Sequence, residues 1–262
     1  MGNVLSGAAK AKERAAAAAP AAAAWPAVTI LIVTYNRLKE VCQVIEALRQ
    51  NVHYPGELRW HLADDCTPRK SYIADIQRAF PDVEFTSTVV PEVAGWGVNC
   101  NTGLRAVTTP YVFQCEDDQV AKRTIDLECG VFIMEQRPDV GLVRYDGLAG
   151  HHLVLLLDET PIVKGRREHF LLVDRRLSLK RKELYGYSNR PHLKHRRFHE
   201  VLGLYPRGVK LGATEELFAS RVMTHIGGPE IVALSDGISR AFQHVGKSWQ
   251  HTADDVGMDI AT

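Results

Sequence analysis

The sequence has no long hydrophobic run and few cysteines. A membrane-spanning helix needs about 18 or more consecutive apolar residues, whereas the longest candidates here, such as Val28 to Val33, have the length of a strand. The five cysteines are odd in number and show no CxxC spacing, which argues against a disulfide framework or a zinc site. We therefore expect a protein without a transmembrane segment, in a reducing, cytoplasmic setting.

The first 27 residues lack both a core pattern and the apolar segment of a secretory signal. They are mostly alanine with scattered Lys and Arg, so we predict a disordered, partly helical tail over residues 1–27. The whole chain of 262 residues is 45% hydrophobic, enough for one large or two small folded units with a core.

The net charge is close to zero, at +1, but it is unevenly distributed. Between Lys164 and Arg197 there are twelve Lys or Arg and three Asp or Glu. Such a local excess of positive charge indicates an anionic partner.

Short apolar, β-branched runs alternate with helical patterns through the first half of the chain. This alternation predicts an α/β sheet that binds its ligands at the carboxyl ends of the strands. After Gly147 the pattern is less regular, although a helix is expected from Thr214 to about His225. The expected strands are Val28 to Val33, Leu58 to Ala63, Phe85 to Val90, Pro110 to Glu116 and Val140 to Tyr145, and the expected helices are Leu38 to Leu48, Ser71 to Phe80, Gly95 to Val107 and Arg123 to Gln136.

Polar motifs follow three of these strands. They are Thr34-Tyr35-Asn36-Arg37, Asp64-Asp65 and Glu116-Asp117-Asp118. Adjacent carboxylates repel one another, and their desolvation is costly unless a cation or hydrogen-bond donors answer them. A divalent metal would meet this need at a sheet edge, while a solvated acidic turn is the simpler alternative.

The chain contains four motifs in order, Val28 to Arg37, Ala63 to Thr67, Gly97 to Leu104 and Cys115 to Asp118. In this order they resemble the GT-A fold glycosyltransferases, particularly the large inverting group called family 2. The resemblance covers roughly residues 28 to 125 and implies a mixed α/β sheet flanked by helices. It assigns residues 28–147 to a nucleotide-sugar-binding half and residues 148–262 to a less regular acceptor-binding half.

The resemblance also implies roles for individual residues. The donor would be a nucleotide sugar, with UDP as the usual nucleotide, and Asp118 would bind Mn²⁺ or Mg²⁺ bridging the diphosphate. His244 is a candidate second metal ligand. The expected donor-binding residues are Thr34 and Tyr35 at the nucleoside, Asn36, Arg37 near the phosphates, Asp65 at the base, Asn101, Glu116 at the nucleotide's sugar, and Asp117.

Inverting transfer needs a general base to take the acceptor proton. The run Thr214 to Arg221 is similar to the family's acidic pair at a helix start, and we rank Glu215 ahead of Glu216 as the base. Acids in a first helical turn also stabilise the helix dipole without any catalytic role. The chain departs from the family at Cys66 and Thr67, where glycine and serine are common.

The acceptor follows less directly from the sequence. Aromatic residues interleaved with Lys and Arg between Tyr185 and His199 could stack bases and neutralise phosphates, so a hydroxymethylated DNA base is one expected acceptor. His192, His195 and His199 are expected to belong to this basic surface. The alternatives are a glycan or lipid-carrier acceptor, a solvated basic face, a non-catalytic GT-A binding module, and a nucleotidyltransferase, for which the chain lacks a glycine- and lysine-rich phosphate loop.

Overall fold

The computed structural model describes residues 25–145, 154–156, 162–163, 166–167, 170–180, 186–209, 212–234 and 241–245. The predicted tail lies outside these residues except at its end, where Trp25 packs edge-on against Tyr54 with ring centroids 6.0 Å apart. The Tyr54 hydroxyl donates to the carbonyl of Pro26. The tail was therefore predicted to extend too far, because Trp25 and Pro26 belong to the packed part of the chain.

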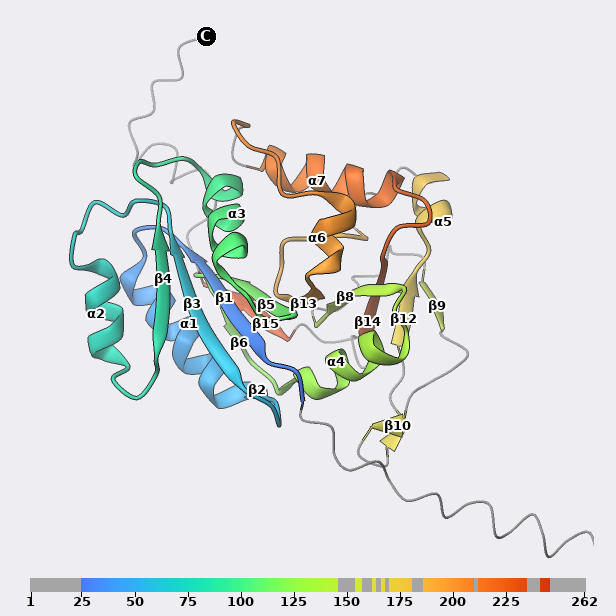
Figure 1. Ribbon diagram of the computed structural model, residues 1–262, viewed down its shortest axis with the longest axis horizontal. Helices are drawn as coiled ribbons and strands as arrows, with labels where there is room; N and C mark the ends of the chain where they lie inside the picture. Colours follow the sequence, from blue (N-terminus) through green and yellow to red (C-terminus); the bar gives the residue numbers. More distant parts are fainter. Residues whose placement is uncertain are drawn as a thin grey trace, which may run out of the picture.

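A nine-stranded sheet forms the centre of the described structure, in the order β4-β3-β1-β5-β13-β8-β14-β12-β9 (Figure 1). The strands β4, β3, β1 and β5 are parallel, whereas β13 runs antiparallel to both of its neighbours, β5 and β8. The nine strands are β1 (Val28–Thr34), β3 (Leu58–Asp64), β4 (Phe85–Val89), β5 (Tyr111–Glu116), β8 (Val140–Arg144), β9 (Val154–Leu156), β12 (Phe170–Val173), β13 (His192–His195) and β14 (Glu230–Leu234).

Three two-stranded pairings accompany this sheet. The pair that matters for the site joins β6 to β15, because β6 follows the acidic cluster directly. The six short strands are β2 (Val52–His53), β6 (Gln119–Ala121), β7 (Ile125–Asp126), β10 (Ile162–Val163), β11 (Arg166–Arg167) and β15 (Phe242–His244).

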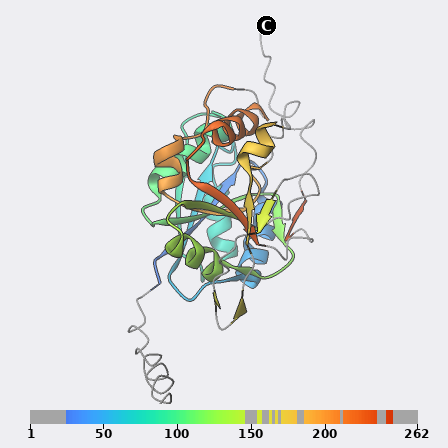
Figure 2. The same cartoon turned by 90° about the vertical axis from the view of Figure 1, so that its right-hand side faces the viewer.

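Helices cover both faces of the sheet, as Figures 1 and 2 show. One apolar cluster joins α1, α2 and α4 to the side chains of Ile30 and Phe113, and another joins α3, α6 and α7 to those of Leu31 and Val112. Every residue of β1 is buried, as a parallel strand covered on both faces requires. The helices are α1 (Leu38–Asn51), α2 (Tyr72–Ala79), α3 (Trp96–Ala106), α4 (Leu127–Gln136), α5 (Arg175–Lys180), α6 (Arg197–Leu202) and α7 (Ala213–Thr224).

The predicted α/β sheet flanked by helices is confirmed, and the first-half elements lie where the sequence placed them. The main difference is β13, which we expected to be part of a basic surface. It instead fills the middle of the sheet, and His192, Leu193 and Lys194 are all buried. Strands from both predicted halves thus share one sheet. No helix in the described part of the chain is long and apolar enough to cross a membrane.

Candidate functional site

The carboxyl ends of β1, β3 and β5 lie side by side, which confirms the predicted arrangement of the three motifs. In the parallel register Thr34 pairs with Asp64, and Val33 pairs with Glu116. The loops that leave these strand ends therefore begin at one edge of the sheet.

Two of these loops contain residues in the left-handed region of φ. Asn36 has φ 51° and Cys66 has φ 59°, a conformation that non-glycine residues adopt only at some cost. The turns are held in place by Thr67, whose hydroxyl accepts from the Asn36 N–H at 2.8 Å and whose own N–H donates to Asp64 Oδ2 at 3.0 Å. A glycine would adopt the φ of Cys66 without this cost.

Asp117 organises the loop that follows β1. Its Oδ2 accepts from Thr34 Oγ1 and from the Tyr35 N–H, both at 3.0 Å, and its Oδ1 accepts from Arg37 Nη1 at 3.2 Å. Burial raises the pKa of Asp117 to about 6, although the Arg37 charge opposes this. Asp117 and Thr34, which also bonds the Tyr72 hydroxyl, are turned into the protein. Their side chains therefore shape the loop, and their roles at the donor stay predictions.

Asp65 holds a second loop. Its two carboxylate oxygens accept from the N–H groups of Ala94 and Gly95, each at 2.9 Å, and the residue is 6% exposed. We expected Asp65 to meet the base of a nucleotide. The structure adds that both oxygens hold the segment that leads into α3, and the role at the base stays a prediction.

Asn101 also bonds to the backbone of another segment. It is completely buried, and its amide exchanges two hydrogen bonds with the backbone of Tyr205, at 2.9 and 3.0 Å. In this structure the Asn101 amide ties α3 to the backbone of Tyr205, and its role at the donor stays a prediction. Its neighbour Asn99 was missed, although it donates to the carbonyls of Ala63 and Thr34 and joins two strand ends.

Tyr35, Asn36 and Arg37 are the donor-binding candidates that keep access to solvent. Tyr35 and Arg37 are partly exposed and Asn36 is exposed. Burial and the neighbouring Asp65 raise the pKa of the Tyr35 hydroxyl, which therefore remains a hydrogen-bond donor.

Asp118 has one carboxylate oxygen whose hydrogen bonding is not satisfied by the described residues. Its Oδ1 is buried and has no hydrogen-bond partner among the described residues. Its Oδ2 lies 3.1 Å from His244 Nε2 and also pairs with Arg37. The Val245 N–H donates to the Asp118 carbonyl at 2.8 Å, which anchors the end of β15 beside the acidic cluster. The structure thus brings together the two predicted metal ligands.

This donor set fits a divalent cation that a substrate helps to hold. No three His, Cys, Asp or Glu side chains within the described ranges gather tightly enough to enclose a metal ion. Mg²⁺ commonly takes one or two carboxylates and completes its shell with water and phosphate oxygens, and imidazole suits Mn²⁺. The unpartnered Oδ1 of Asp118 and the nearby His244 Nε2 would supply the protein's share of such a shell.

Glu116 is the first residue of the acidic cluster. Burial and the charges of Asp118, Glu215 and Asp117 raise its pKa well above the usual range, and Arg37 only partly opposes them. The effect of Glu215 on this pKa means that the start of α7 lies near the end of β5, although the two are about a hundred residues apart in sequence.

Glu215 and Glu216 differ sharply in their surroundings. Glu215 Oε1 accepts from Ser188 Oγ at 2.9 Å and from the Asn189 N–H at 2.8 Å, whereas Glu216 is exposed. The two hydrogen bonds fix one oxygen of Glu215 beside the acidic cluster, and the other oxygen has no protein partner in the described part of the chain. The sequence held no signal for Ser188 or Asn189.

The basic stretch does not form one surface in the residues described. Arg175 is 5% exposed and donates to the carbonyls of His225 and Pro229, while Arg197 donates to those of Met134 and Val140. Guanidinium groups that satisfy backbone carbonyls serve the fold, because their N–H donors are no longer available to a partner.

Of the three histidines of this stretch, His192 was placed wrongly at the surface, whereas His195 and His199 are partly exposed. His192 is completely buried, and burial lowers its pKa and that of His199 well below the usual range. Both are therefore neutral near pH 7. Arg176, Lys180, Arg190 and Arg196 are the exposed cations among the described side chains of the stretch, which also includes residues outside the described ranges.

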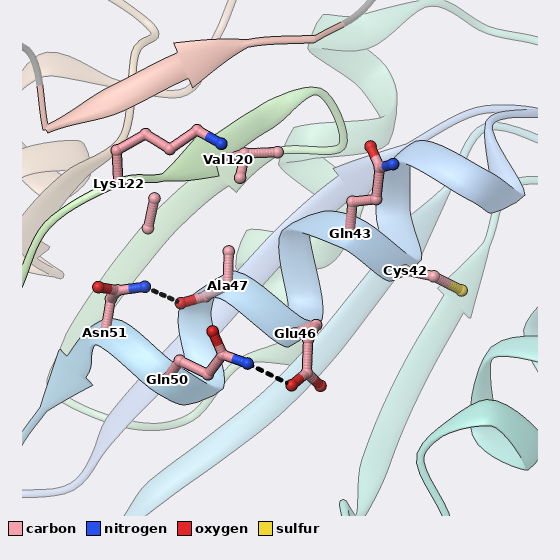
Figure 3. Close-up of a pocket in the computed structure, with 9 residues that line it drawn as sticks. Cys42, Gln43, Glu46, Ala47, Gln50, Asn51, Val120 and Lys122 are labelled. Atoms are coloured by element: carbon pink, nitrogen blue, oxygen red, sulfur yellow. Dashed lines mark hydrogen bonds between the residues drawn. The ribbon is translucent and has the colours of Figure 1, made fainter.

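An open groove of about 580 Å³ lies elsewhere, along α1 and β6 (Figure 3). It is lined by Cys42, Gln43, Glu46, Ala47, Gln50, Asn51, Val120, Ala121 and Lys122. It shares no residue with the predicted site, and two of its polar side chains bond within α1 itself.

The comparisons with known proteins agree with this geometry. Residues 29–172, more than half of the chain, match the family described as Glycosyl transferase family 2. None of the curated proteins searched matches the chain.

Several solved structures share the fold. The TarS 1-349 structure from S. aureus in complex with UDP-GlcNAc has a TM-score of 0.62 at 16% identity, covering 86% of this chain and 60% of that one. The mannosyltransferase PcManGT from Pyrobaculum calidifontis, in complex with GDP-Man and Mn²⁺, has a TM-score of 0.54 at 17% identity, covering 87% and 59%. This chain therefore spans about 60% of the length of these structures.

Proposed function

Because the chain belongs to glycosyl transferase family 2, we propose that it transfers a sugar from a nucleotide sugar to an acceptor hydroxyl with inversion, assisted by Mn²⁺ or Mg²⁺. The observation that carries this proposal is that Glu215, held by Ser188 and Asn189, lies near enough to Glu116 for its charge to raise the pKa of that carboxyl. A site that only binds a nucleotide has no need for a second, separately anchored carboxylate beside the one that holds a metal.

The donor end is assigned to the loop after β1. Tyr35, Asn36 and Arg37 stand beside the acidic cluster with access to solvent. The solved relatives named above hold UDP-GlcNAc in one case and GDP-Man with Mn²⁺ in another, so both nucleotides are tested, with UDP as our first choice. The guanidinium of Arg37, which pairs with Asp117 and Asp118, is placed to meet the diphosphate.

The chemistry follows from what each carboxylate has to do. As the bond to the sugar breaks, the leaving diphosphate gains negative charge, and a metal ion bound at Asp118 and His244 would supply Lewis-acid stabilisation. Glu215 would take the proton of the acceptor hydroxyl as that oxygen attacks the anomeric carbon. Its Oε1 is held by Ser188 and Asn189, which leaves its second oxygen for the acceptor.

The acceptor is a hydroxyl compound whose class needs a direct test. The inward-facing Arg175, Lys194 and Arg197 remove part of the charge on which a DNA acceptor depends, so glycan and lipid-carrier acceptors are screened alongside hydroxymethylated DNA. DNA binding should weaken steeply with rising salt. No binding at low salt would eliminate the DNA acceptor.

The first experiment measures melting temperature with UDP or GDP, with and without Mn²⁺. A nucleotide present at about 100 times its dissociation constant should raise the melting temperature by about 5 °C. Asp118→Ala should lose the metal-dependent part of this shift, while Glu216→Gln, a change at an exposed acid of the same site, should retain it. An unchanged metal-dependent shift in Asp118→Ala would refute the metal assignment.

A further inference from the structure

A chain of buried polar groups runs beneath the acidic site, and the proposed reaction does not use it. Lys194 is 1% exposed, and its Nζ donates to Gln114 Oε1 at 2.6 Å and to the Tyr205 hydroxyl at 3.0 Å. The Tyr205 hydroxyl lies 2.7 Å from that of Tyr187, which donates to Asn189 Oδ1 at 3.0 Å. Lys194 has no carboxylate partner among the described residues, and a buried charge of this kind is costly to fold, so this arrangement calls for a physical explanation.

The hydrogen bonds in this chain can run in a single direction. The Tyr187 hydroxyl has one proton, which it gives to the carbonyl oxygen of Asn189. The Tyr205 hydroxyl also has one proton, which it can give to Gln114 Oε1 at 3.1 Å or to the Tyr187 hydroxyl. When Tyr205 donates to Tyr187, all the bonds from Lys194 to Asn189 point the same way, because Lys194 is the donor to Tyr205. Hydrogen bonds aligned in this way polarise and strengthen one another in a medium of low dielectric.

One end of the chain reaches the candidate base. Asn189, which accepts the last hydrogen bond, donates its own N–H to Glu215 Oε1, and Ser188 beside it donates its hydroxyl to the same oxygen. The other end lies below the acidic cluster, because Gln114 and Glu116 are two residues apart on β5 and so face the same side of the sheet.

Packing prevents the chain from shifting. Tyr187 is completely buried, stacked on Phe198 with centroids 6.2 Å apart and edge-on to Phe218 at 5.0 Å. Phe218 lies on α7, three residues after Glu215. The same ring that carries the hydrogen bond thus also fixes the distance between α7 and the segment that contains Ser188 and Asn189.

We propose that Lys194, Tyr205, Tyr187 and Asn189 form a positioning network that holds Ser188 and Asn189 against Glu215 and so keeps the base aligned with the acceptor. The inference rests on the proposed function, because it requires Glu215 to be the base. None of the four side chains touches substrate, and their effect on turnover passes through Glu215 alone.

The test compares two Tyr→Phe variants that remove the same atom. Tyr187→Phe deletes one link of the network, while Tyr145→Phe deletes the hydroxyl of another buried tyrosine, which donates to the Asp126 carbonyl at 3.1 Å, outside the network. Hydrogen exchange of the segment 186–190 needs no substrate. In Tyr187→Phe the Asn189 amide should exchange at least tenfold faster, and in Tyr145→Phe it should exchange as in the wild type.

Turnover is followed as nucleotide release from UDP-N-acetylglucosamine and GDP-mannose with Mn²⁺, water taking the place of the acceptor. Tyr187→Phe should lower kcat at least tenfold with an unchanged donor KM, whereas Tyr145→Phe should change kcat less than twofold. Asn189→Ala removes the other half of the same hydrogen bond. The double variant Tyr187→Phe/Asn189→Ala should therefore be no slower than the slower single variant.

The experiments separate a failure of the positioning network from a failure of the proposed function. Wild-type exchange and kcat in Tyr187→Phe, together with an inactive Glu215→Gln, would overturn the positioning network and leave the proposed function standing. Full activity in Glu215→Gln would overturn the base assignment, on which both proposals depend. If the wild type hydrolyses neither nucleotide sugar, unchanged exchange at Asn189 still overturns the network, and accelerated exchange supports it.

Discussion

The loop 34–37 and the segment 186–199 border the same site, yet they relate to the sequence in opposite ways. The loop follows a continuous apolar strand, and its polar residues lie at the sheet edge where the alternation of strands and helices placed them. The segment is rich in charge and looks like a surface, but it contains the central strand β13, with Lys194 and His192 buried. Local periodicity thus predicts burial well where the buried residues are apolar. It predicts burial poorly where the buried residues are polar and are held by hydrogen bonds.

The largest effect is expected at Glu215, whose Oε1 accepts hydrogen bonds from Ser188 and Asn189 of the segment 186–199. Glu215→Gln should lower kcat by about 10² to 10⁴, the usual contribution of a general base, without changing the melting shift caused by UDP and Mn²⁺. Sugar transfer in a donor and acceptor screen read by mass provides the measurement. Glu216→Gln is the matched control, since it makes the same change at an exposed acid one residue away. An inactive Glu216→Gln beside an active Glu215→Gln would reverse the ranking.

The second prediction concerns the cost of burying Lys194. Burial lowers its pKa from 10.5 to about 7. Between these values the unfolded chain binds one proton more than the folded chain, so the free energy of unfolding should rise with pH, by up to about 1.4 kcal/mol per pH unit. Below pH 7 the full cost is present, and above about 10.5 it is absent.

Lys194→Met should remove this slope and make the protein relatively more stable below pH 7, as replacement of a buried charge by an apolar side chain often does. Urea unfolding at several pH values measures the difference between variant and wild type. Lys122→Met, at an exposed lysine, should leave the slope unchanged. Equal slopes for the wild type and Lys194→Met would mean that Lys194 is solvated.

The smallest effect is expected at the turn after β3, in the part of the chain whose structure the sequence predicted well. Cys66 has φ 59°, a conformation that costs a non-glycine residue about 1–3 kcal/mol. Cys66→Gly should therefore raise the free energy of unfolding by about 1 kcal/mol, after the greater flexibility of glycine in the unfolded chain is subtracted.

Cys66→Ala is the control for this change, because it removes the thiol and keeps the strained turn. It should show no gain in urea unfolding. If the alanine and glycine variants are equally stable, the turn is not strained, and the departure from glycine at this position has no energetic meaning.

Particular residues show where sequence reasoning ended. The acidic cluster, the three strand ends and the neighbouring positions of Asp118 and His244 follow from motifs in order, and the structure brings them together. Asp65 and Asn101 have the residue types that the resemblance implies, yet their polar atoms are bound to backbone. A motif specifies a residue type, whereas the partner of its side chain depends on a segment elsewhere in the chain.

The sequence by itself determined the α/β alternation of the first half and the edge at which the polar motifs gather. Both follow from the period of apolar residues, which acts over a few neighbours in the chain. Only the tertiary structure decided that Glu215 is anchored while Glu216 is exposed, and that Arg175, His192 and Lys194 of the basic stretch lie inside the protein. These outcomes depend on hydrogen bonds between residues that are far apart in sequence, such as Lys194 with Gln114 and Asn189 with Glu215, and no local pattern encodes them.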